Sequence, residues 1–132
     1  MRRDAREAVC RYLYSCLITG EADCELKKYL YNEHKMNDKD VEFADTLISL
    51  VEKNQEELIS ELSTLSIGYN IDRINYPDKA AMLIAMTEIT SFEDIDVAVS
   101  IDEAVRLVKK YGAESSVSFV NGVLGEFARR RG

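Results

Sequence analysis

The feature of this sequence that most limits its fold is an apolar segment near the middle of the chain. From Ala80 to Met86 every residue is apolar, and Lys79 and Thr87 flank the segment. It is far shorter than the roughly 18 apolar residues of a membrane-spanning helix. A helix that is apolar on every side is surrounded by other helices. We therefore expect Ala80–Met86 to form the centre of a helical protein.

Apolar residues elsewhere in the chain recur at three- and four-residue steps, which is typical of amphipathic helices. This periodicity predicts helices over residues 5–17, 23–30, 38–51 and 58–65, and two more in the last forty residues. The chain has one proline and no sustained alternation of apolar and polar residues. The sequence therefore predicts an all-α fold of about six or seven helices in two packed bundles, as one domain over residues 1–132.

Helix starts and connections can be predicted from polar residues. We expect Asp23 to cap the second helix and Asp38 or Asp40 to cap the third, because carboxylate oxygens accept from the first free N–H groups. The apolar phase shifts near Asn54, which predicts the start of a separate fourth helix. A longer connection follows the fourth helix, with predicted turn residues at Gly68, Asn70 and Asn75.

The last forty residues predict a helix, a tight turn and a second helix. Gly112 is expected to end the first of these helices in the left-handed conformation. Ser115 or Ser116 is expected to cap the second. In that second helix Phe119 falls at the edge of the apolar stripe, next to Ser118. Phe119 can therefore be an accessible surface ring or a core residue at the rim of the bundle.

The formal net charge of −7 is unevenly distributed along the chain. Acidic residues predominate in the body of the chain, whereas arginines gather at both ends: Arg2, Arg3, Arg6, Arg11, Arg129, Arg130 and Arg131. This distribution allows one anion-binding patch and one face for a basic partner. Two ordinary solvated ends would give the same composition.

No pattern in the sequence indicates catalysis, a metal site or a cofactor. His34 is the only histidine, and it has no neighbouring cluster of ligands or nucleophiles. The segment Asn37–Asp40 lacks the glycine and glutamate that a calcium loop needs. Asp102 and Glu103 are adjacent in sequence, so they do not face each other on a helix and are interpreted as a solvated or capping pair. We expect a non-enzymatic protein without cofactors.

Three cysteines, Cys10, Cys16 and Cys24, form neither a disulfide framework nor a zinc motif, because their number is odd and no CxxC spacing occurs. Cys10 and Cys16 are interpreted as small apolar helix residues in a reducing compartment. The N-terminal segment has no small-residue cleavage site after an uninterrupted apolar stretch. These features predict a cytoplasmic protein.

Two segments, one near each end of the chain, carry recognisable motifs. The first is Arg2–Val9 followed by Leu13–Tyr14, and the second comprises Ile101–Val105, Tyr111–Gly112 and Phe119–Leu124. In their order and separation these motifs resemble the NusB family of bacterial transcription antitermination factors. The resemblance covers the whole chain.

The resemblance implies an all-α fold of two helical bundles that binds boxA, a short single-stranded RNA signal of ribosomal RNA operons. It also implies pairing with the small-subunit ribosomal protein that acts as an antitermination subunit, within a complex on RNA polymerase. Some members of the family self-associate, so a homodimer is an open alternative to a monomer.

Carried over by motif, the resemblance implies that RNA is contacted by Arg2, Arg3, Arg6, Ser118 and Phe119. Arginines bind phosphate oxygens in a bidentate manner and release counterions. An accessible phenyl ring is a platform on which a base can stack. This interpretation expects the arginines and Phe119 to meet at one surface.

The remaining motif residues are given other roles by the resemblance. Asp78 matches an acidic contact to the protein partner. Residues with an expected structural role are Tyr14, Glu103, Asn121 and Gly122. Gly122 and Gly125 together would allow a neighbouring helix to approach closely.

Departures from the family pattern leave two alternatives. Leu83 replaces a frequent arginine, and Ser115 and Ser118 occupy positions near the RNA face that are often charged. The chain could therefore be a helical protein-interaction module, docking a partner or forming a homodimer, that has lost RNA binding. A similar domain also occurs as an appendage of ribosomal RNA methyltransferases, an interpretation against which the chain length argues.

Overall fold

The computed structural model describes residues 2–66 and 70–131. Within these residues it contains six α-helices and two 3₁₀ helices: α1 (Arg2–Thr19), α2 (Cys24–Glu33), α3 (Asp38–Leu65), η1 (Ile71–Arg73), α4 (Tyr76–Ser91), α5 (Val97–Tyr111), η2 (Glu114–Ser116) and α6 (Val117–Arg131). The all-α prediction is confirmed. The predicted turn residue Gly68 lies outside the described residues.

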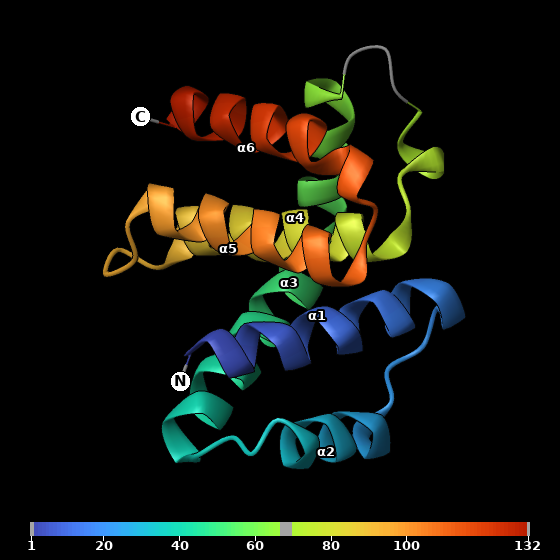
Figure 1. Cartoon of the computed structure of the whole chain (residues 1–132), viewed down its shortest axis with the longest axis vertical. Helices are drawn as coiled ribbons and strands as arrows, with labels where there is room; N and C mark the ends of the chain where they lie inside the picture. The colour runs from blue at the N-terminus through green and yellow to red at the C-terminus, as the bar shows by residue number, and fades with distance from the viewer. Residues whose placement is uncertain (1, 67–69, 132) are drawn as a thin grey trace.

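Helix α4 is the centre of the fold, as the apolar segment predicts. It contacts α1, α3, α5 and α6 (Figure 1). Every residue from Ala80 to Glu88 is buried. Asn75 caps the helix by accepting the N–H of Asp78 at 3.0 Å, and Pro77 lies in the first turn, where its missing N–H is tolerated.

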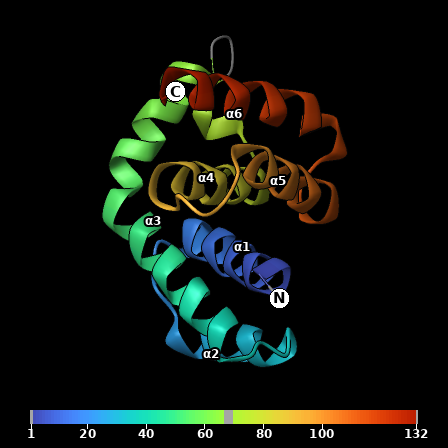
Figure 2. The ribbon, with the colours of Figure 1, turned by 90° about the vertical axis from the view of Figure 1, so that its left-hand side faces the viewer.

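Helix α3 connects the two helical bundles, because it contacts α1 in one bundle and α6 in the other. It packs against α1, lies beside α2 at one end, where Tyr31 of α2 donates to Asp45 at 2.8 Å, and reaches α6 at the other end (Figure 2). The prediction of two helices separated near Asn54 is wrong, because α3 is one helix of 28 residues, about 42 Å long. The apolar phase shifts because the packing partners of α3 change along its length.

Two of the predicted helix starts can be compared with the structure. Asp23 caps α2 by accepting the N–H of Leu26 at 3.0 Å, which confirms that prediction. Helix α3 is capped by Asn37 instead of Asp38 or Asp40. Asp40 completes the capping box by accepting the backbone N–H of Asn37 at 3.3 Å. The amide side chain one residue earlier therefore takes the role expected of the aspartates.

Gly112 ends α5 in an extended conformation with φ −106°, so the predicted left-handed conformation is wrong. The need for glycine here is steric. A Cβ atom on Gly112 would lie 1.9 Å from Oδ1 of Asp78. The same oxygen accepts the N–H of Ala113 at 3.3 Å, so the turn after α5 lies directly against the first turn of α4.

Gly122 and Gly125 do not receive a neighbouring helix. A Cβ atom on either glycine would meet nothing within 4 Å among the described residues. Gly122 is exposed and Gly125 is half-buried. The predicted close helix approach at these glycines is therefore wrong within this chain.

None of the helices in the described ranges is both long enough and apolar enough to cross a membrane.

A matched pair of glycine substitutions tests this packing. Gly112→Ala should lower the free energy of unfolding by about 1–3 kcal/mol, because the added methyl group displaces the Asp78 carboxylate from its hydrogen bonds. Gly122→Ala, in an open helical position, should raise it by up to about 1 kcal/mol. Urea denaturation of both variants is the measurement. Equal stability of the two variants would contradict the close contact at Gly112.

Candidate nucleic-acid interface

The first turn of α1 carries two exposed arginines. The Arg3 side chain is 59% exposed, and its Nε and Nη2 atoms lie 3.3 Å from the two carboxylate oxygens of Glu103 on α5. Arg2 donates from Nη2 to Asp94 at 3.1 Å, and its guanidinium lies 4.7 Å from the centre of the Phe43 ring. Both guanidinium groups are thus oriented by acids while remaining accessible to an anion in solution.

Arg6 lies inside the protein, although its motif predicts an RNA contact. It is 4% exposed. Its Nε and Nη2 atoms donate to the two carboxylate oxygens of Glu88 at 2.7 and 3.0 Å, and its Nη1 atom donates to Glu103 at 3.3 Å. Ser100 donates a further hydrogen bond to Glu88 at 2.9 Å. The buried guanidinium joins α1 to α4 and α5 and has no access to a ligand in this structure.

Glu103 is a buried partner of three arginines. It is 8% exposed and accepts from Arg3, Arg6 and, at 3.0 Å, Arg106. Burial raises the pKa of this carboxyl, but the hydrogen bonds and charges of Arg3 and Arg106 together outweigh burial and lower the pKa. The interpretation of Asp102 and Glu103 as a solvated pair is therefore wrong for Glu103, whereas Asp102 is exposed.

Glu7 on α1 binds three side chains of α5, a cluster that the motifs did not indicate. Its carboxylate accepts from Arg106 at 2.8 Å, from Lys110 at 2.6 Å and from the Tyr111 hydroxyl at 2.8 Å. Burial raises its pKa, but the hydrogen bonds of Lys110, Arg106 and Tyr111 outweigh burial and lower the pKa to about 2. One signal was available, because Glu103, Arg106 and Lys110 are spaced to share one face of a helix.

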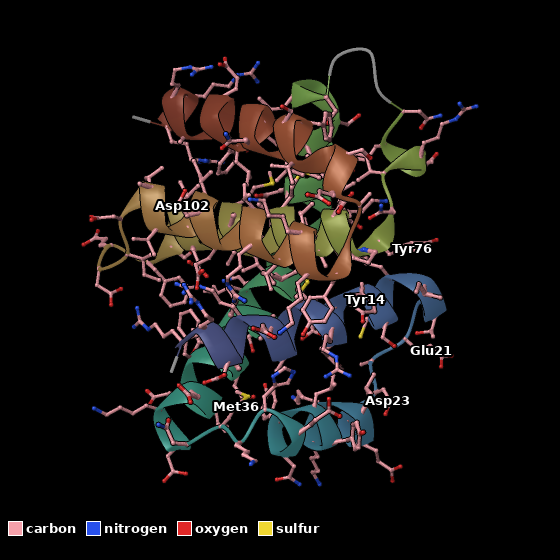
Figure 3. All side chains as sticks on the ribbon, viewed as in Figure 1. Tyr14, Glu21, Asp23, Met36, Tyr76 and Asp102 are labelled. Atoms are coloured by element: carbon pink, nitrogen blue, oxygen red, sulfur yellow. The ribbon has the colours of Figure 1, made fainter. Side chains whose placement is uncertain are left out.

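Tyr14 packs beside the end of α5. Its ring centre lies 6.5 Å from that of Tyr111, with the planes tilted by 46°. Both rings are half-buried. Figure 3 shows Tyr14 near the C-terminal end of α5 and Asp102 near the other end of the same helix.

Phe119 lies in the first turns of α6, beside a hollow of about 240 Å³ between α6, η1 and the start of α4. The hollow is lined by Asn70, Arg73, Ile74, Asn75, Asp78, Ser115, Ser116 and Phe119. Phe119 is half-buried against the core, and Ser118 and Asn121 are exposed. The structure therefore places Phe119 between the two sequence interpretations, partly packed and partly accessible.

Asp78 lines the hollow and does not lie on the outer surface. It is 1% exposed. Burial raises its pKa, while hydrogen bonds from Ser116, Ala113 and Asn75 oppose that shift. Its contacts hold the turn between α5 and α6 against α4.

The arginines and Phe119 lie at opposite ends of α5. Arg3 pairs with Glu103 in the first half of this helix, whereas Phe119 follows the turn at its end. In Figure 1 the start of α1 is at the left, the start of α6 is at the right, and α5 runs between them. The arginines and Phe119 thus flank α5 at its two ends.

No group of three or more histidine, cysteine or acidic side chains within residues 2–66 and 70–131 is arranged to hold a metal ion.

Comparisons with known proteins agree with this architecture. A family model described as the NusB family matches residues 3–129. The transcription antitermination protein NusB of Acetivibrio thermocellus is 33% identical over 128 residues, which cover 97% of this chain and 88% of that protein. The corresponding protein of Dehalococcoides mccartyi is 32% identical over 128 residues, covering 97% of this chain and 90% of that protein.

Solved structures show the same similarity. T. maritima NusB matches with a TM-score of 0.89 at 28% identity, covering 98% of this chain and 91% of that chain. A crystal structure of the antitermination factors NusB and NusE in complex with dsRNA matches with a TM-score of 0.86 at 28% identity, covering 98% of this chain and 96% of that chain.

A two-bundle helical fold and a match over nearly the whole length define a non-enzymatic transcription antitermination factor. More specifically, the chain belongs to the NusB family. The resemblance seen in the two motifs is confirmed.

The Glu7 cluster predicts a pH-dependent contribution to stability. Glu7→Gln should lower the free energy of unfolding at pH 7 by about 1–3 kcal/mol, because Arg106 and Lys110 lose their charged acceptor. The pKa of Glu7 is lowered by folding, so its contribution is present above pH 4.5 and is lost as the pH falls toward 2. The difference between variant and parent should therefore shrink over that range.

Denaturation in urea at a series of pH values measures this difference. Glu56→Gln is the matched control, because Glu56 is exposed on α3. A difference that stays constant between pH 7 and pH 3 would contradict the ionised cluster.

Proposed function

We propose that this protein binds boxA-type single-stranded RNA together with a small-subunit ribosomal protein, as part of an antitermination complex on RNA polymerase. The observation that carries the proposal is the placement of exposed, acid-oriented arginines at one end of α5 and a half-exposed phenylalanine at the other, in a chain of the NusB family. A cytoplasmic location and action of the whole chain as one RNA-binding domain are part of this proposal.

Arg2 and Arg3 are the phosphate-binding residues of the proposal. Each guanidinium keeps accessible donors while an acid holds it in place, Asp94 for Arg2 and Glu103 for Arg3. A guanidinium already oriented loses less side-chain freedom when it binds phosphate. Phe119 supplies a stacking surface worth about 1–3 kcal/mol per base, and Ser118 a neighbouring hydroxyl.

Arg6 and Asp78 have positioning roles in the proposal. Arg6 fixes the first turn of α1 against α4 and α5, so it sets where Arg2 and Arg3 lie. Asp78 holds the turn that precedes Phe119. Substitution of either residue should reduce RNA binding through the structure, with a parallel loss of stability.

The protein partner is supported by similarity. A NusB structure that matches this chain over 98% of its length contains NusE and RNA. The net charge of −7 suits a basic ribosomal protein as partner.

An RNA titration at several salt concentrations tests the proposal. Arg3→Gln should weaken binding of boxA RNA and lower the slope of log affinity against log salt by about 0.7, because one phosphate contact is lost. Phe119→Ala should weaken binding by about 1–3 kcal/mol with little change in slope, because stacking releases no counterions. Lys53→Gln, an exposed cation on α3, is the control and should bind as the parent does.

Titrations are made with the protein alone and with its ribosomal partner. Affinity that does not respond to salt or to scrambling of the RNA sequence would sink the proposal. Capture of the ribosomal partner without retention of RNA would instead favour the protein-interaction module, and light scattering would show whether that module is a homodimer.

A further inference from the structure

The seam between α1 and α5 joins the two halves of the proposed RNA surface. We define the seam by five residues linked through hydrogen bonds in this order: Arg3, Glu103, Arg106, Glu7 and Lys110. Its Arg3 end is the phosphate-binding end of the proposed function. At its Lys110 end, Tyr111 and the turn at Gly112 lead to α6 and Phe119. A single-stranded RNA that contacts both Arg3 and Phe119 therefore passes along this seam.

The exposed charge of the seam is positive. Three cations face only two carboxylates, and both carboxylates are nearly buried beneath the cations. The Lys110 side chain is 53% exposed, whereas the Glu7 side chain is 9% exposed. A lysine ammonium has three donors, and Lys110 uses one of them on Glu7. In a chain of net negative charge, this seam presents cations to an approaching anion.

One buried donor of the seam has no acceptor. Arg106 donates from Nη1 to Glu7 and from Nε to Glu103, but its buried Nη2 atom has no hydrogen-bond partner among the described residues. An unpaired buried donor on a charged group is costly. A phosphate oxygen is well matched to a guanidinium, because it adds opposite charge to the hydrogen bond. Nη2 itself is buried, so a phosphate approaches Arg106 through the 25% of its side chain that is exposed.

We infer that Lys110 and Arg106 form a phosphate-binding site in the middle of the seam, where the RNA backbone passes between Arg3 and Phe119. This inference rests on the proposed function. Glu7 is a positioning residue for the site, because it holds the ammonium and the guanidinium at the surface of α5 without facing the ligand itself. Such a site supplies cationic contacts on the helix that precedes Ser115 and Ser118, which carry no charge.

Neighbouring lysines provide a matched test. Lys109 and Lys110 are adjacent on α5 and both exposed, but only Lys110 binds Glu7 in the seam. Lys110→Gln should weaken binding of single-stranded boxA RNA about three- to tenfold near 0.1 M salt and lower the salt slope by about 0.7. Lys109→Gln should change neither quantity, and Lys110→Arg should keep the parent slope, because it keeps the charge.

A second measurement uses the unaltered protein. Acetylation by an amine-reactive reagent, followed by mass spectrometry, should show Lys110 protected by bound RNA and Lys109 not protected. This result does not depend on how well a variant folds.

The outcomes separate the two ideas. If the unaltered protein shows no salt-dependent RNA binding, the proposed function and this inference both fail. If it binds RNA but Lys110→Gln binds like Lys109→Gln, or if RNA protects both lysines equally, only the seam site fails and the proposed function stands.

Discussion

The structure depends on one buried ion pair, between Arg6 of α1 and Glu88 of α4. Both side chains are almost completely buried, and the two hydrogen bonds between them have distances of 2.7 and 3.0 Å. Removing one partner of such a pair leaves an uncompensated buried charge, at a cost of about 3–5 kcal/mol. Because Ser100 and Glu103 of α5 bind the same pair, it fixes three helices at one point. Because Arg2 and Arg3 precede Arg6 on the same helix, this ion pair also determines where those two exposed arginines lie.

The same carboxylates serve both the interior and the surface. Glu103 accepts hydrogen bonds from buried Arg6 and from exposed Arg3. The ion pairs of the interior are therefore linked directly to those of the surface. Glu7 plays the same part further along the seam, with Arg106 and Lys110. A surface built in this way is already ordered before a ligand arrives, which lowers the entropy lost on binding. Stability and the proposed RNA binding are therefore coupled along α1 and α5.

Hydrophobic pattern predicted the helices well and their ends less well. The apolar run from Ala80 predicted the central helix, because a helix without a polar face has only one stable environment. The phase shift near Asn54 wrongly predicts two helices, because a change of packing partner and a helix break produce the same pattern in a sequence. The sequence correctly predicts that α5 ends at Gly112, but the left-handed conformation behind that prediction does not occur. The contact of Gly112 with Asp78 joins residues 34 positions apart, which local periodicity does not register.

By itself, the sequence determined the helical class, the buried identity of α4 and, through two terminal motifs, the family. These properties follow from local spacing and residue type. Only the tertiary structure decided which arginines are accessible, since Arg3 and Arg6 lie on the same helix three residues apart and both bind Glu103, yet the Arg3 side chain is 59% exposed and the Arg6 side chain 5%. It also decided that Phe119 lies at the opposite end of α5 from the arginines. Burial and ion pairing depend on residues that are close in space but distant along the chain, and a short sequence motif contains no information about those residues.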